Sequence, residues 1–117
     1  MEETYRQLVE ILLPAGTLDY FDLTRVYKDR EGLNIYLEEK NVPPQEYKDE
    51  VLHSKGFTPE VQIRDFPIRE HKVALCIKRR RWEIASSGET VTRNWDLVMS
   101  GTRITKEFGL FLKGALR

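Results

Sequence analysis

The first residues of the chain show the spacing of a helix. Four apolar residues recur as one face of an amphipathic helix would: Tyr5, Leu8, Val9 and Leu12. Glu2 and Glu3 suit the positive end of a helix dipole, and Pro14-Ala15-Gly16 provides a stop. We therefore expect a helix from about residue 2 to residue 13.

An alternating pattern follows and predicts a β-hairpin. We expect strands over residues 20–27 and 33–38, joined by a turn over residues 28–32. From Leu33 to Leu37 apolar residues alternate with others, so the second strand should bury one face.

Prolines divide the middle of the chain into short segments. Pro43-Pro44 ends the hairpin, and the polar residues 45–56 are expected to form a loop or a short helix. A short strand is then predicted over residues 61–66, where it is interrupted by Pro67.

The most strand-like segment is Val73–Trp82. Its first half, Val73–Ile77, is apolar on both sides, which is typical of a strand buried on both faces. Residues 86–89 have the composition of a turn, and residues 90–95 are β-prone. Residues 72–95 are therefore expected to form a second hairpin.

A closing helix is expected from about Thr102 to Leu116, with Ile104, Phe108 and Phe111 on one face. The predicted fold class is α+β, with an N-terminal helix, two antiparallel hairpins and a C-terminal helix. We expect a single domain over residues 1–117. Whether the two hairpins share a sheet is left open.

Composition supports a folded chain of one domain. It has 117 residues, of which 40% are hydrophobic and 32% charged. No run is long enough for a membrane span, and the acidic start does not resemble a signal peptide. The single Cys76 excludes an internal disulfide and a cysteine-based zinc site, so we expect a cytoplasmic protein.

The zero net charge conceals two halves of opposite sign. Residues 1–60 hold seven Lys/Arg and thirteen Asp/Glu, whereas residues 61–117 hold twelve and six. A polyanion would therefore face the second half, from residue 61 onward. The acidic half suits either a partner-binding surface or protection against non-specific binding to nucleic acid.

Catalytic motifs are not found in the sequence. His53 and His71 have no companion at metal-ligand spacing, and there is no glycine-rich phosphate loop or Gly-x-Ser-x-Gly elbow. We therefore expect no enzyme activity, no cofactor, no metal and no small-molecule substrate.

The candidate nucleic-acid contacts begin with four consecutive cations, Lys78, Arg79, Arg80 and Arg81, followed by Trp82. In a strand these alternate sides, so either Arg79 with Arg81 or Lys78 with Arg80 would face one way. Arg93, Arg103 and Lys106 would extend the patch to about five phosphate contacts. Alternatively, the arginine run guards an edge strand against aggregation.

Three segments in this order resemble the N-terminal region of bacterial insertion-sequence transposases that begin with a zinc-ribbon domain. They are Ile63-Arg64-Asp65-Phe66-Pro67-Ile68, then Arg80-Arg81-Trp82, and then Thr102-Arg103-Ile104-Thr105-Lys106-Glu107-Phe108. His53-Ser54 also falls where that family tends to carry a His-Ser pair. The resemblance, which covers nearly the whole chain, is to a subgroup without the zinc cysteines.

The chain departs from that family at the second cysteine knuckle, where it has Ala85-Ser86-Ser87-Gly88. Zinc is therefore not expected, and packing of Trp82 against Trp95 across the hairpin could replace part of its stabilisation. The resemblance also implies a catalytic domain with an acidic metal-binding triad. That domain would be encoded in a separate reading frame, or the chain is a split or decayed copy.

Two functions remain open. The first is a non-catalytic DNA-binding region that contacts element ends and acts with a separate catalytic transposase component in DNA transposition, in the bacterial nucleoid. The second is an assembly domain that docks the catalytic subunit without touching DNA. A homo-oligomer is compatible with both, because transposases often need one for synapsis.

Overall fold

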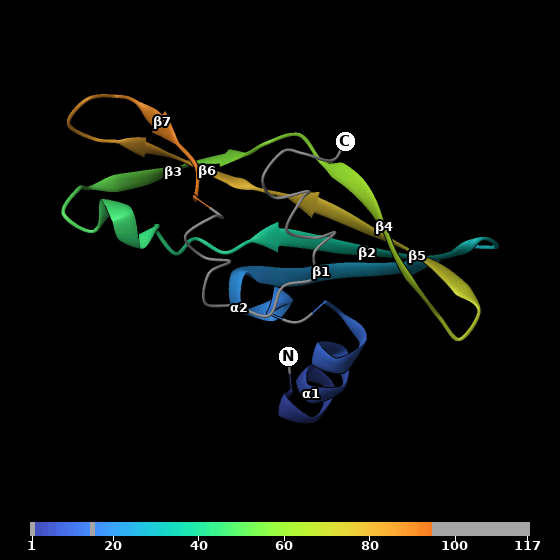
Figure 1. The fold of residues 1–117 in the computed structure, drawn as a ribbon. Coiled ribbons are helices and arrows are strands. Elements are labelled where there is room, and N and C mark those ends of the chain that lie inside the picture. Colours follow the sequence, from blue (N-terminus) through green and yellow to red (C-terminus); the bar gives the residue numbers. More distant parts are fainter. Residues whose placement is uncertain (1, 15, 95–117) are drawn as a thin grey trace.

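The computed structural model describes residues 2–14 and 16–94, which form two β-sheets and short helices (Figure 1). The helical elements are α1 (Glu3–Leu12), α2 (Thr17–Tyr20) and the 3-10 helix η1 (Gln45–Tyr47). The strands are β1 (Phe21–Lys28), β2 (Gly32–Glu39), β3 (Leu52–Phe57), β4 (Val61–Ile68), β5 (His71–Lys78), β6 (Arg80–Ile84) and β7 (Thr90–Val91). The α+β class and the N-terminal helix are confirmed. The expected C-terminal helix and Trp95 lie outside the described residues.

The larger sheet has the strand order β1-β2-β5-β4. The predicted first hairpin is confirmed as β1 and β2, which pair antiparallel. Its turn is shaped by the Asp29 carboxylate, which accepts the backbone N–H groups of Glu31 and Gly32 at 2.8 and 3.0 Å. These bonds favour the ionised carboxylate and hold the pKa of Asp29 below its usual value.

The pairing of β2 with β5 is parallel, from Gly32 opposite Lys72 to Glu38 opposite Lys78. We expected antiparallel hairpins alone, and this was wrong. Val73, Leu75 and Ile77 of β5 are buried in the core, and Cys76, which points to the opposite face, is 1% exposed. This burial explains why the Val73–Ile77 run carries no charged side chain.

One face of the larger sheet forms the main core. Leu37, Leu75 and Ile77 are fully buried there, together with Phe21 and Leu18 from the α2–β1 segment. Helix α1 lies at the periphery (Figure 1), and none of its residues is buried. No described helix is long and apolar enough to cross a membrane.

Strand β4 runs through Pro67 rather than ending before it, which corrects the expected interruption. Pro67 lies between Asp65 and Ile68, where the register with β5 shifts. Because β4 is an edge strand with a single partner, a missing backbone N–H at this position costs no ladder bond.

The smaller sheet has the order β3-β6-β7 and its own apolar cluster of Trp82, Ile84 and Val91. We expected residues 45–56 to form a loop or short helix; η1 is that helix, but β3 is a strand. The sequence of β3 is mostly polar and does not show the alternation of apolar and polar residues that predicts a strand. Pairing with β6 is what orders it.

The predicted second hairpin over residues 72–95 is wrong in extent. The chain leaves the larger sheet at Lys78, passes through Arg79 and enters the smaller sheet at Arg80. Only β6 and β7 form the expected hairpin, while β5 pairs with β4 and β2. The first part of the predicted second hairpin, β5, therefore shares the larger sheet with the first hairpin, and only β6 and β7 belong to the smaller sheet.

Candidate nucleic-acid interface

The cationic run from Lys78 to Arg81 lies at the junction of the two sheets, and its members point to different environments. Lys78 ends β5, and its Nζ lies 3.8 Å from the Glu38 carboxylate on the neighbouring strand. Both side chains are partly exposed, so the pair contributes at most about 1 kcal/mol. Lys78 therefore stays accessible at the edge of the junction.

Arg80 is held by the end of strand β2. Its Nε donates to the Glu39 backbone carbonyl and its backbone N–H donates to Glu39 Oε1, both at 3.0 Å. The guanidinium also donates to Ser54 Oγ and lies 4.5 Å from the Phe57 ring centroid. Arg80 thus joins three segments of the chain and is used by the fold.

Arg93 is buried, with 8% of its surface exposed. Its Nε donates to Glu39 Oε2 at 2.9 Å, and a terminal nitrogen donates to the Val42 carbonyl. The guanidinium stacks between aromatic residues, 5.3 Å from the Tyr20 ring and 5.8 Å from the Trp82 ring. Sequence analysis placed Arg93 in the phosphate-contacting patch, whereas the structure places it in the interior.

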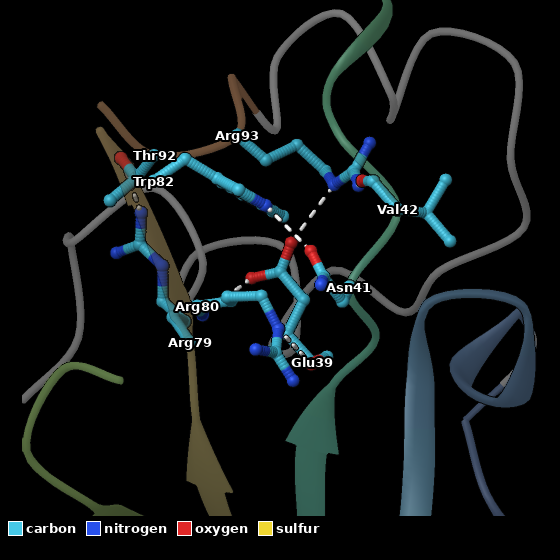
Figure 2. A network of polar contacts seen from close by, with 8 residues as sticks. All are labelled: Glu39, Asn41, Val42, Arg79, Arg80, Trp82, Thr92 and Arg93. Carbon is cyan, nitrogen blue, oxygen red and sulfur yellow. Dashed lines mark hydrogen bonds and ion pairs between the residues drawn. The ribbon is translucent and has the colours of Figure 1, made fainter. Parts of the chain in front are cut away.

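Glu39 is the residue on which these arginines converge (Figure 2). It is 1% exposed and receives the Arg80 backbone N–H and Arg93 Nε. Burial raises the pKa of its carboxyl group, and the two donors together with the Arg93 charge oppose this rise. The Glu39–Arg80–Arg93 cluster, named here the junction cluster, fastens the smaller sheet to the larger one.

Trp82 completes the junction from the smaller sheet. Its ring is fully buried, and Nε1 donates to Asn41 Oδ1 at 3.0 Å. A buried indole N–H needs such an acceptor. The proposed packing of Trp82 against Trp95 falls outside the described residues.

Arg79 and Arg81 lie apart from the junction cluster. Arg81 is exposed and donates to the Lys55 carbonyl at 3.4 Å, and Arg79 extends toward Thr92, with Nη2 3.4 Å from its Oγ1 (Figure 2). Because Trp82 faces the interior of the smaller sheet, Arg81 faces its outer side. Of the two pairings left open by the sequence, the structure favours Arg79 with Arg81.

Lys55 adds a cation to the outer side of the smaller sheet. Lys55 on β3 lies 3.6 Å from the Glu83 carboxylate, and both side chains are partly exposed. Arg79 Nε is enclosed and has no hydrogen-bond partner among the described residues. Lys55, Arg79 and Arg81 form a surface that we name the outer basic face.

Two predicted contacts, Arg103 and Lys106, lie outside the described residues. His53 is exposed on β3, and within residues 2–14 and 16–94 no group of three His, Cys, Asp or Glu residues is arranged to hold a metal ion. Cys76 is 1% exposed, and burial raises the pKa of its thiol.

Sequence analysis missed Glu39, although a signal was present. Leu33, Ile35 and Leu37 point to the core, and Glu39 continues the same alternation. An acidic residue at an inward position of a strand indicates a buried cationic partner. Comparison with protein families, curated proteins and solved structures finds no match to this chain.

Proposed function

We propose that the chain is a non-catalytic DNA-binding region of an insertion-sequence transposase, which contacts element-end DNA and acts with a separate catalytic component. The proposal draws on the order of the three sequence segments that resemble such transposases. From the structure, it is supported by the outer basic face, and above all by the projection of Arg79 and Arg81 away from the junction cluster.

The outer basic face has the properties of a phosphate-binding surface. Each of Arg79 and Arg81 makes one long hydrogen bond at 3.4 Å from its terminal guanidinium nitrogen, so further donors remain for phosphate oxygens. Lys55 on β3 belongs to the same face, and Lys78, which ends β5, directly precedes Arg79 in the chain. Their carboxylate partners are surface groups that a phosphate can replace at low cost.

The proposed contacts differ from those that the sequence predicted. Among the described residues, Arg80 and Arg93 serve the junction cluster, which leaves Lys55, Lys78, Arg79 and Arg81 for DNA. Arg103 and Lys106 stay predicted contacts. Four phosphate contacts give a slope of about −3.6 for log K against log salt. Such contacts carry no sequence information, so recognition of element ends would need the catalytic component or further residues.

Fluorescence anisotropy of labelled duplex DNA, measured at several salt concentrations, tests this proposal. Arg79→Ala with Arg81→Ala should reduce the salt slope by about 1.8 and leave the melting temperature nearly unchanged. Arg30→Ala with Arg69→Ala is the matched control, because both residues are exposed and lie in the β1–β2 and β4–β5 turns of the larger sheet. Salt-independent binding, or equal losses in both double variants, would contradict the proposal.

The second candidate is an assembly domain, and the exposed face of α1 favours it. Tyr5, Leu8 and Ile11 are 62%, 55% and 80% exposed. The partner would be the catalytic transposase component, encoded near this chain. Co-purification of the two proteins that is lost in Leu8→Glu with Ile11→Glu, together with no DNA binding by the parent, would favour this candidate over the first.

A further inference from the structure

Helix α1 presents large apolar side chains to solvent on the side turned away from the core. Val9 is half-buried and packs on the main core, and Leu13, directly after the helix, is buried. Four large apolar side chains on another side of the helix are exposed: Tyr5, Leu8, Ile11 and Leu12. The solvated side of a helix is ordinarily polar, so this side has the character of a contact surface.

The exposed apolar side of α1 continues onto β4, an edge strand of the larger sheet, across a groove of about 440 Å³. Ile11 and Leu12 line this groove from the helix, and Phe66 and Pro67 line it from the strand. The Phe66 side chain is 76% exposed. We name the groove, together with the exposed apolar side of α1, the α1–β4 groove.

The surroundings of the α1–β4 groove are acidic. Residues 2–12 hold three glutamates and a single arginine, Arg6, which pairs with Glu10 at 3.0 Å. Asp65 and Arg69 at the β4 end add one charge of each sign. An apolar ligand that brings positive charge is therefore favoured. A second copy of α1 would bring the same excess of negative charge, and lipid surfaces attract helices with a basic polar side instead.

Residues 95–117, which lie outside the described part of the chain, have the complementary composition. They hold four Lys/Arg and two Asp/Glu. Five apolar residues recur there at the spacing of one helix face: Ile104, Phe108, Phe111, Leu112 and Ala115. An amphipathic helix binds an apolar groove through anchors spaced in this way. Lys106 and Lys113 fall on the opposite side of the predicted helix and would remain accessible.

The segment begins close enough to α1 to reach the groove. The Arg93 guanidinium lies 5.3 Å from the ring of Tyr20, which ends α2, and α2 begins five positions after α1 ends. The ten residues from Asn94 to Ile104 can span about 30 Å when extended. This reach is about twice the length of α1, which has ten residues.

We propose that residues 104–115 dock in the α1–β4 groove of the same chain through the apolar face that includes Ile104, Phe108 and Phe111. The groove is distinct from the outer basic face, so this inference is independent of the proposed DNA binding. It assigns to the chain itself the side of α1 that the second candidate function offers to a catalytic component. Such a partner would have to displace the segment, which therefore acts as an internal competitor.

Crosslinking of cysteine pairs in the full chain tests the docking. Cys76 is 1% exposed and should not react, so a pair can be introduced at other sites. Gln7→Cys with Glu107→Cys, positions beside the two apolar faces, should be joined within one chain by a bis-maleimide. Glu89→Cys with Glu107→Cys is the matched control, because Glu89 is exposed and only five positions before Asn94. An undocked segment would reach Glu89 at least as readily as α1.

The docked segment should give about tenfold more crosslinked product for the Gln7 pair than for the Glu89 pair, because docking raises the local concentration of one thiol near the other. Equal yields for the two pairs overturn the proposal. Crosslinks of the Gln7 pair that join two chains would assign the groove to a second copy and also overturn it.

Thiol reactivity gives a second readout. Leu8 is 55% exposed in the described part of the chain and Val51, near the smaller sheet, is 63% exposed. Leu8→Cys should nevertheless react with a soluble disulfide reagent about tenfold more slowly than Val51→Cys, which corresponds to a groove open in about one molecule in ten. Adding Phe108→Glu and Phe111→Glu should remove this difference. Equal rates at the outset, or slow reaction that persists in the glutamate variant, overturn the proposal.

Discussion

Glu39 Oε2 accepts a hydrogen bond from Arg93 Nε at 2.9 Å, and the two residues are 54 positions apart in the sequence. Glu39 is 1% exposed, so its carboxylate has exchanged water for protein donors. The pair lies where the two sheets meet, and Arg80 adds two bonds from the first residue of β6. The Glu39 carboxylate therefore joins the end of the larger sheet to two segments of the smaller one.

Loss of the charged partner of Glu39 should destabilise the fold strongly. Arg93→Met leaves the buried Glu39 carboxylate without that partner. The change should cost about 3–5 kcal/mol of unfolding free energy. Urea denaturation measures this cost. Lys55→Met, which removes an exposed ion pair, is the control and should cost less than about 1 kcal/mol.

The raised pKa of Glu39 predicts the direction of one pH effect. Because the folded chain binds this proton more tightly than the unfolded chain, the contribution is complete below the ordinary value of 4.5 and declines as pH rises through the folded pKa. The stability of the parent relative to Glu39→Gln should therefore fall as pH increases above 4.5. Urea titrations of both proteins over a pH series measure this difference. A rise over the same interval would contradict it.

Gly32 should not tolerate a side chain. A Cβ at this position would lie 2.0 Å from the Lys72 backbone carbonyl oxygen on the adjacent parallel strand. Gly32→Ala must therefore separate β2 from β5, and a cost of about 1–3 kcal/mol or more is expected. Thermal denaturation measures it.

Gly56→Ala is the matched control for that experiment, since a Cβ there meets nothing within 4 Å. Its φ of +84° adds only local strain, of roughly 1–2 kcal/mol. If the two alanine variants melt at the same temperature, close approach of the strands is not what requires glycine at position 32.

The indole of Trp82 should contribute both packing and a hydrogen bond. Asn41→Ala would leave the buried Nε1–H without its acceptor, at a cost of about 1–3 kcal/mol. Trp82→Phe removes the donor. The double variant Asn41→Ala with Trp82→Phe should therefore lose less unfolding free energy than the two single variants lose in total. A double-mutant cycle by urea denaturation measures this coupling. Strict additivity would show that the hydrogen bond contributes nothing.

Local patterns predicted the elements whose partners are close in sequence. The spacing of Tyr5, Leu8 and Leu12 identified α1, and the alternation from Leu33 to Leu37 identified β2. The β6–β7 part of the second hairpin also followed from its turn. These elements could be predicted because interactions between residues close in the sequence determine them.

Long-range pairings could not be obtained in the same way. Nothing local distinguishes Arg93, buried against Glu39, from Arg81, exposed on the outer basic face. Arg93 follows Thr92 and Arg81 follows Arg80, and neither polar neighbour indicates which of the two arginines is buried. The division of the arginine run between the junction cluster and the outer basic face depends on β2, β3 and β6 meeting in space. The one local signal was Glu39, an acidic residue at a position where the alternation of β2 predicts a core-facing side chain.

The parallel pairing of β2 with β5 has a consequence for the order in which the chain acquires its structure. Gly32 lies opposite Lys72, forty positions later. The entropy of closing this long loop must therefore be lost before the hydrogen bonds of the ladder can compensate for it. Hairpins β1–β2, β4–β5 and β6–β7 close over short turns and can form first. During synthesis on a ribosome, the edge of β2 that pairs with β5 stays unpaired until β5 has emerged. Folding rate should therefore respond to changes along the β2–β5 ladder more than to changes in any hairpin turn.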